Sequence, residues 1–303
     1  MNESRRGLSY GIAAYSLWGL APLFWKLLGG VSPLEILAHR VVWGAVAFWA
    51  IVSMVGAGPA VRAALRDRQT VAAMALSGTL LAINWGTFVG AVATGHILDA
   101  SLGYFMIPLL SVGLGMVVLH ERLRHLQWLA IGFAVIGVAL LTWHAGRVPW
   151  ISVVVATTFG AYGLVRKLAR VESLAGSTIE TALIAPIAAA YLVIQAWRGE
   201  GQLGHAAMGT QLLLLSTGVV TAVPLMLFTS AARRLPLSTI GFLQYLGPTG
   251  QFGLAVGVYG EAFSREQLVA FGFIWVGLAV FSVDLVRQSP RWRAPAPISR
   301  TGP

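Results

Sequence analysis

The 303-residue sequence has no cysteine, which excludes a disulfide framework and a metal site built from thiolates. Charged residues are also scarce. Asp, Glu, Lys and Arg together make up 11% of the chain, whereas a soluble domain contains about 25%. The shortage extends along the whole length of the chain, so lipid is the expected solvent.

Apolar and small residues are abundant instead. The chain is 57% hydrophobic, its mean hydropathy is +0.75, and its 35 Gly and 13 Pro interrupt many apolar runs. Membrane helices tolerate Gly and Pro better than soluble helices do. The net charge of +10 would suit nucleic acid, but the basic residues lie in short loops between apolar runs. We therefore expect a lipid bilayer, and no nucleic acid, as the partner.

Ten apolar runs are long enough to cross a bilayer, which takes about 20 helical residues. With the N-terminus in the cytoplasm, the inside segments hold 16 of the 21 Lys and Arg and the outside loops hold three, as the positive-inside rule requires. We predict a multi-pass protein of the cytoplasmic (inner) membrane with both termini cytoplasmic, ending in a disordered tail over residues 288–303. The predicted spans are residues 8–28, 34–55, 71–92, 98–119, 126–143, 149–167, 176–197, 210–230, 237–258 and 267–286.

The chain contains an internal repeat. Residues 98–141 match residues 238–281 at an offset of 140, with 11 identities in 44 positions. The identities include Pro108 with Pro248, Glu121 with Glu261 and Gly137 with Gly277. Each half has five spans, an odd number, so the second half enters the membrane from the opposite side. The predicted fold is an all-α integral membrane protein with ten transmembrane helices in a 5+5 inverted-topology repeat, divided into residues 1–145 and 146–287, and this pattern is typical of secondary transporters.

Charged side chains at membrane depth are costly and usually face a cavity or a partner. Here they form two predicted clusters, one at each face of the membrane. We hypothesise that the clusters are outer and inner gates that close in turn, and that some of them couple transport to protons. Fixed salt bridges that pin neighbouring helices are the alternative. The gate or coupling charges are Lys26, Glu35, His39 and Arg40 on the outer side, and Arg166, Lys167 and Glu180 on the inner side.

Polar and aromatic side chains inside the spans are candidates for the lining of a substrate cavity. Amide groups need hydrogen-bond partners in a dry environment, which another helix, a substrate or water would supply. Aromatic rings stack on flat or apolar ligands, although tryptophans also form interfacial belts. The cavity candidates are Tyr15, Trp18, Asn84, Trp85, Tyr104, Tyr162, Gln244 and Tyr245.

Five prolines fall inside predicted spans. Each removes one backbone hydrogen bond and can kink its helix. Pro108 and Pro248 occupy matching repeat positions, and paired helix interruptions mark a binding site or hinge in carriers. The predicted kinks are at Pro22, Pro108, Pro186, Pro224 and Pro248.

Two further patterns concern helix packing and helix ends. Gly86/Gly90 and Gly253/Gly257 are GxxxG pairs, which permit close helix approach. They serve internal packing or dimerisation, so a monomer and a homodimer both remain open. Asp99 is expected to cap the start of the fourth span.

Motifs for covalent chemistry are weak. Residues 7–11 match G-x-S-x-G, but that motif requires a preceding strand and here opens an apolar helix. Residues 120–125 miss the H-E-x-x-H spacing by one position. An intramembrane enzyme would need carboxylates or a metal set at one depth, yet Glu35 and Glu180 are expected on opposite sides. We predict that the protein is not an enzyme and has no cofactor and no metal.

Short stretches throughout the chain carry a family resemblance. They are Trp18-Gly19 with Pro22 and Lys26, Glu35 through Arg40, Asn84-Trp85, Ala100 through Phe105 with Pro108, Tyr162 through Lys167, Ile179-Glu180-Thr181, Leu237-Ser238-Thr239 with Gly241-Phe242 and Gln244-Tyr245, and Tyr259-Gly260-Glu261. With these, the chain resembles the RarD-type proteins of the EamA group in the drug/metabolite transporter superfamily, over about residues 8–286. The resemblance implies ten helices, a five-plus-five inverted repeat, cytoplasmic termini, a central cavity, and export or exchange of small organic solutes.

The sequence therefore predicts a carrier that moves small organic metabolites or drugs by alternating access. A passive channel and an intramembrane enzyme are the alternatives, and a structural protein would not need the inverted repeat. The identity of the solute, the direction of transport and the coupling ion stay open.

Overall fold

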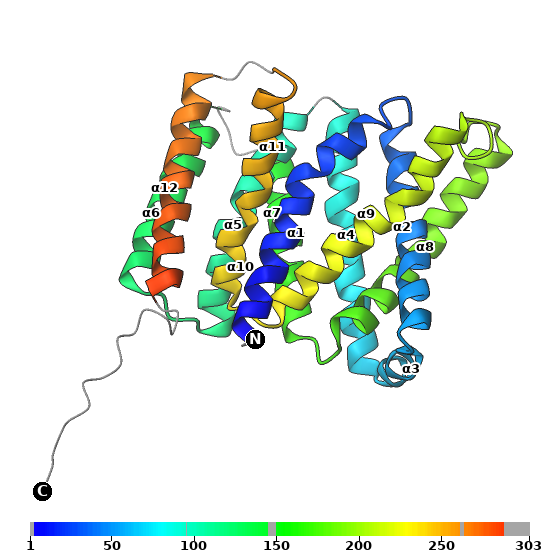
Figure 1. Ribbon diagram of the computed structural model, residues 1–303, viewed down its shortest axis with the longest axis horizontal. Coiled ribbons are helices and arrows are strands. Elements are labelled where there is room, and N and C mark those ends of the chain that lie inside the picture. Colours follow the sequence, from blue (N-terminus) through cyan, green and yellow to red (C-terminus); the bar gives the residue numbers. More distant parts are fainter. Residues whose placement is uncertain (1–2, 95, 145–149, 261–263, 288–303) are drawn as a thin grey trace, which may run out of the picture.

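The computed structural model describes residues 3–94, 96–144, 150–260 and 264–287, and within these ranges every regular element is a helix. The predicted tail at residues 288–303, and Glu261 of the repeat, lie outside the described residues. The helices are α1 (Glu3–Lys26), α2 (Pro33–Met54), α3 (Gly58–Arg66), α4 (Arg68–Ala93), α5 (Ile97–Leu119), α6 (His125–His144), α7 (Trp150–Leu168), α8 (Ser173–Trp197), α9 (Met208–Ala232), α10 (Leu237–Gln244), α11 (Leu246–Gly257) and α12 (Arg265–Arg287) (Figure 1).

Eight of the described helices, namely α2, α4 to α9 and α12, are long and apolar enough to cross a membrane. This confirms the all-α membrane fold. Two predicted spans do not reach the same threshold. The first lies in α1, where Ser, Tyr, Trp and Gly alternate with the apolar residues, and the ninth is divided between α10 and α11.

The ninth span breaks at Tyr245, between helices of 8 and 12 residues. Pro248 has no N–H group, so the carbonyl of Gln244, the last residue of α10, has no helical donor four residues later. The predicted kink at Pro248 is therefore an interruption of the helix. The other four prolines lie inside continuous helices, α1, α5, α8 and α9.

Two local features go beyond the sequence predictions or differ from them. Helix α3, between the second and third predicted spans, was not predicted, and it is a short helix whose Val61 is buried while Arg62 is exposed. Asp67 then caps α4, and the hydrogen bond from the Thr70 hydroxyl lowers the pKa of its carboxyl. The expected cap by Asp99 is wrong, because α5 begins two residues earlier and His96 occupies the capping position.

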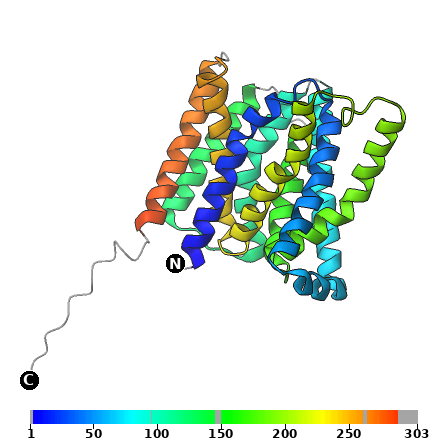
Figure 2. The same cartoon turned by 45° about the vertical axis from the view of Figure 1, so that its right-hand side comes forward.

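The helices pack in a few close pairs. Helix α6 lies beside α12, α5 lies between α7 and α10, and α2 packs on α8 and α9. Helix α1 packs on α9 and α11, and α4 packs on α7 and α8. In both views α6 and α12 stand together at one edge of the bundle (Figures 1 and 2). The start of α1, helix α3 and the end of α12 lie at the same end of the molecule (Figure 1).

The contact between α6 and α12 is reciprocal. A Cβ atom on Gly137 would lie 2.7 Å from the carbonyl oxygen of Ala270, and a Cβ on Gly277 would lie 2.7 Å from that of Ala130. Ala270 and Gly277 are the positions 140 residues after Ala130 and Gly137. The two helices therefore meet through equivalent residues of the repeat.

The GxxxG pairs do not make such contacts. A Cβ added to Gly86, Gly90, Gly253 or Gly257 would meet no atom of the described structure within 4 Å. The predicted use of these pairs for packing within the chain is therefore wrong. Their use in a dimer stays a prediction.

Candidate functional site

A buried charge network lies where α4, α7 and α8 meet. Glu180 of α8 is fully buried, and its Oε2 lies 3.3 Å from Nη1 of Arg166 on α7. The hydroxyl of Ser77, on α4, donates to the same oxygen, and the hydroxyl of Tyr162 donates to Oε1 at 3.3 Å. The structure thus brings two of the predicted inner gate charges together and adds Ser77, which the sequence reasoning missed.

Arg166 has further partners that leave little of it open. Its Nη2 donates to the carbonyl of Ser173 at 3.1 Å and to the hydroxyl of Ser177 at 3.2 Å. Lys167, by contrast, does not join the network. Its ammonium donates to the carbonyl of Leu235, in the segment between α9 and α10.

Several positive charges lie at this end of the molecule. The carbonyl of Leu235 accepts the hydrogen bond of Lys167, and the side chain of Leu235 lies against Gly7 of α1. Arg233 follows α9, and its partial burial lowers the pKa of its guanidinium, while the charges of Arg166 and Arg234 act in the same direction.

A second buried pair lies near the start of α2, as the four-residue spacing predicted. Glu35 Oε1 is 3.8 Å from His39 Nε2, and both side chains are buried. His39 Nδ1 accepts a hydrogen bond from the indole of Trp43 at 3.0 Å. The backbone N–H of Gln202, between α8 and α9, donates to Glu35 Oε1 at 2.6 Å.

The other two outer charges lie apart from this pair. Lys26 is exposed, and its ammonium sits 3.5 Å from the centre of the Tyr259 ring. Arg40 lies between the indole rings of Trp25 and Trp85, each centred 4.7 Å from its Cζ. The predicted outer cluster is therefore three separate arrangements.

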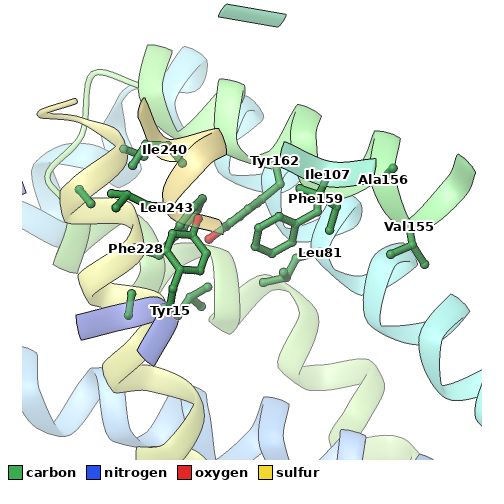
Figure 3. Packing of buried hydrophobic residues seen from close by; sticks show 14 of the residues in the cluster. Tyr15, Leu81, Ile107, Val155, Ala156, Phe159, Tyr162, Phe228, Ile240 and Leu243 are labelled. Atoms are coloured by element: carbon green, nitrogen blue, oxygen red, sulfur yellow. The ribbon is translucent and has the colours of Figure 1, made fainter. Parts of the chain in front are cut away.

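Aromatic side chains fill the centre of the molecule. Tyr15 of α1 lies with Phe159 and Tyr162 of α7 and with Phe228 of α9 (Figure 3). Trp18 of α1 packs on Tyr15, Phe159 and Phe228. Tyr162 and Phe228 are stacked, with ring centres 5.7 Å apart. Tyr15 and Tyr162 are buried and Trp18 is partly exposed. The cluster thus reaches from α1 to the Glu180 network through the hydroxyl of Tyr162.

The amide side chains predicted to need partners find them in neighbouring helices. Asn84 donates to the carbonyl of Val155 at 2.8 Å and to the hydroxyl of Thr158 at 3.1 Å. Gln244 accepts from the hydroxyl of Ser111 at 3.1 Å. Both amides are buried, as is Tyr245, whereas Trp85 and Tyr104 are partly exposed.

Two hollows in the structure lie away from these residues. The larger has a volume of about 590 Å³ and lies between α2 and α8, against Val46, Trp49 and Pro186. The other lies between α2 and α3. Among the described residues, no three His, Asp or Glu side chains lie close enough together to hold a metal ion.

One anchoring residue was recognised in the sequence only as a marker of the repeat. Glu121 accepts hydrogen bonds from the backbone N–H of Leu237 at 2.6 Å and of Ser238 at 2.9 Å. It also accepts from the Ser238 hydroxyl at 2.7 Å. A carboxylate at the N-terminus of a helix is favourable, so Glu121 fixes the start of α10. Its identity with Glu261 in the repeat was the available signal.

Comparison with known proteins identifies the family. The EamA-like transporter family matches residues 5–143. An uncharacterised transporter of Pseudomonas aeruginosa is 44% identical over 292 residues, which cover 96% of this chain and 98% of the relative. The chain belongs to the EamA-like transporter family. It is also 43% identical to the RarD protein of Escherichia coli strain K12, over 95% of this chain and 98% of that protein, which confirms the RarD-type resemblance.

Two further similarities complete the comparison. The chloramphenicol-sensitive protein RarD of Pseudomonas aeruginosa is 32% identical over 292 residues. A crystal structure with 21% sequence identity superposes with a TM-score of 0.72, over 94% of this chain and all of the other, which shows a shared fold. This EamA-family chain is therefore a multi-pass membrane transporter.

Proposed function

We propose that this EamA-family protein is a secondary transporter that moves small organic metabolites or drugs across the cytoplasmic membrane by alternating access. In this cycle a central site opens to one side and then to the other, as two inverted halves rock against each other. The halves are residues 1–145 and 146–287, with both termini in the cytoplasm.

The reciprocal contact of α6 and α12 carries the proposal, because equivalent residues of the repeat meet across it, as expected for two halves related by a local two-fold axis. Other packing pairs also correspond when each helix is replaced by its counterpart in the other half of the repeat. Contact of α1 with α9 corresponds to contact of α4 with α7, and contact of α5 with α7 corresponds to contact of α1 with α11. The helix starts correspond too. Gln127 accepts a hydrogen bond from the N–H of Arg124, and 140 residues further along the chain Gln267 accepts one from the N–H of Ser264.

Contacts that join the two halves occur at both ends and are the proposed gates. At the inner end, Ser77 of the first half bonds Glu180 of the second. At the outer end, Glu35 of the first half accepts from Gln202 of the second. A transporter that works by alternating access has to break the contacts at one end while it keeps those at the other end. Glu35, His39 and Glu180 are also the groups able to bind a coupling proton.

Counterflow in proteoliposomes tests transport. Purified protein is loaded with amino acids, related metabolites and chloramphenicol, the last because a relative is named for sensitivity to it. Exchange is then read by mass spectrometry. We expect saturable exchange that is accelerated by solute on the far side. A passive channel would show no such acceleration, and a chemically altered solute would indicate an enzyme.

A disulfide lock tests alternating access. The chain has no cysteine, and a Cβ on Gly11 of α1 would lie 3.6 Å from the Cβ of Ala231 on α9, within the range that a disulfide needs. Gly11→Cys with Ala231→Cys joins the two halves near the inner end. We expect oxidation to stop exchange and a reductant to restore it, while each single variant is indifferent to oxidant. Unchanged exchange by the oxidised double variant would contradict the mechanism.

A further inference from the structure

Arg40 is a cation held inside the helix bundle by three other helices. It lies about 10 Å along α2 from the first residue of that helix. Its Nε donates to the hydroxyl of Thr221 on α9 at 3.3 Å. Trp25 of α1 and Trp85 of α4 place their rings against it, each centred 4.7 Å from its Cζ.

Arg40 has no counter-ion among the residues that the structure describes. No Asp or Glu oxygen in the described part of the chain lies within 4.0 Å of its nitrogens. Cation–π contacts offset only part of the cost of removing a charge from water. Charges at membrane depth are normally paired or placed in a functional pathway, and pairing is absent here.

The open part of the guanidinium has the shape of a carboxylate site. Thr221 occupies Nε, and the two terminal nitrogens have no hydrogen-bond acceptor among the described residues. Two parallel N–H groups on this edge can bind both oxygens of a carboxylate. The side chain is partly exposed, as are Trp85 and Tyr104, so the edge is accessible and is bordered by aromatic surface.

We propose that Arg40 binds the carboxylate of the transported solute, and that this transporter carries small organic monoanions with an apolar or aromatic body. One guanidinium balances a single negative charge. The indoles of Trp25 and Trp85 supply the apolar surface for the rest of the solute. The inference rests on the proposed transport function for the movement of the solute, but not for its binding.

Equilibrium binding to the purified full-length protein tests this inference independently of transport. The probes are benzoate, phenylacetate and indole-3-acetate, each compared with its neutral amide, and binding is measured by calorimetry in phosphatidylcholine nanodiscs. We expect at least one carboxylate to bind about tenfold or more tightly than its amide, the ratio expected for a charge-assisted hydrogen-bonded pair. No preference in any of the three pairs would overturn the proposal.

Variants test whether the preference for carboxylate over amide depends on Arg40. Arg40→Gln should reduce the ratio of amide to carboxylate dissociation constants to about one, and Arg40→Lys should retain part of it, because Lys keeps the charge but not the paired N–H edge. Arg62→Gln, an exposed arginine on α3, is the matched control and should retain the full ratio. A full ratio in Arg40→Gln would overturn the proposal. If Arg40→Gln is not monodisperse, the comparison of Arg40→Lys with Arg62→Gln decides, and equal ratios would overturn it.

Two further experiments separate binding of a solute from binding of a lipid headgroup, and solute binding from transport. A lipid headgroup phosphate is another anion, so the titration is repeated with phosphatidylglycerol in the nanodisc. Competition by this lipid would show that Arg40 binds headgroups and would overturn the solute site. If only neutral solutes show counterflow, and Arg40→Gln exchanges them as fast as the unchanged protein, the proposed transport function is supported and this inference is overturned. A carboxylate preference that depends on Arg40 supports the site even where no counterflow is found.

Discussion

The protein has two arginines inside its helix bundle, and their surroundings differ. Arg166, where α4, α7 and α8 meet, is 1% exposed and is bonded to a carboxylate, a carbonyl and a hydroxyl. Arg40, on α2, has one hydroxyl and two indole rings around it. The first guanidinium has a carboxylate partner, and the second has none among the described residues.

The difference separates structural from functional charge in one molecule. A buried cation whose charge is balanced by a carboxylate of its own chain holds helices together, and a ligand has no way to approach it. A cation with an accessible edge and no counter-ion contributes little to folding but can bind an anion. The following predictions test this contrast, in order of decreasing effect.

The largest effect is expected for Arg166→Gln. The substitution leaves the Glu180 carboxylate buried without its cation, and breaking a buried pair costs about 3–5 kcal/mol. We expect the midpoint of thermal unfolding in detergent to fall sharply. The double variant Arg166→Gln with Glu180→Gln should be more stable than the sum of the single changes predicts. Additive losses would show that the pair does not act as a unit.

An intermediate loss of stability is expected when the contact between α6 and α12 is changed. Gly137→Ala and Gly277→Ala each place a methyl group against a carbonyl of the facing helix, and such overpacking costs about 1–3 kcal/mol. Because the two contacts are equivalent, the two losses of unfolding free energy should be similar. Gly132→Ala and Gly272→Ala, on the same two helices, are matched controls, since an added Cβ meets no described atom within 4 Å. A large loss in either control would contradict the assignment.

A smaller effect is expected for Trp85→Leu. Removing one of the two rings beside Arg40 takes away a cation–π contact of about 0.5–1 kcal/mol but leaves the guanidinium edge intact. Carboxylate binding should weaken by about two- to fivefold, measured by the same calorimetric titration. Trp49→Leu, in the hollow between α2 and α8, is the control and should not change it. A loss as large as that of Arg40→Gln would mean that the indole, and not the cation, carries binding.

The smallest effect on stability is expected for Arg40→Gln without ligand. No carboxylate in the described residues is left unpaired by this change, and removing a partly buried charge that lacks a described counter-ion is favourable. The unfolding midpoint should therefore stay the same or rise. A fall comparable to that of Arg166→Gln would remove the contrast between the two arginines.

Hydropathy and charge in the sequence were sufficient for the helices and for the membrane class. They did not predict α3, because a search for long apolar runs passes over nine amphipathic residues. They predicted a kink at Pro248 but not the division of the ninth span into two helices at Tyr245, because a continuous apolar run hides the lost hydrogen bond. Membrane helix patterns describe composition along an axis, and they do not show where one backbone carbonyl loses its donor.

The site was harder to predict, because it depends on which helices face each other. Glu35 and His39 were paired correctly, since four residues of one helix fix their geometry. Lys26 and Lys167 were grouped with carboxylates because they lie near them along the chain, yet packing directs Lys26 to Tyr259 and Lys167 to a carbonyl. The partners of Arg40 come from α1, α4 and α9, and no local spacing brings them together.

The reciprocal seam between α6 and α12 has a consequence for how the protein is made. Gly137 leaves the ribosome 133 residues before its partner Ala270, a delay of roughly 7–27 s at the usual rates of synthesis. Throughout this interval α6 lacks α12, and its side of the seam is covered by lipid or by other nascent chains. Glu121 likewise waits for Leu237 and Ser238. The interval before α12 is made is therefore the stage of synthesis at which a membrane chaperone would matter most.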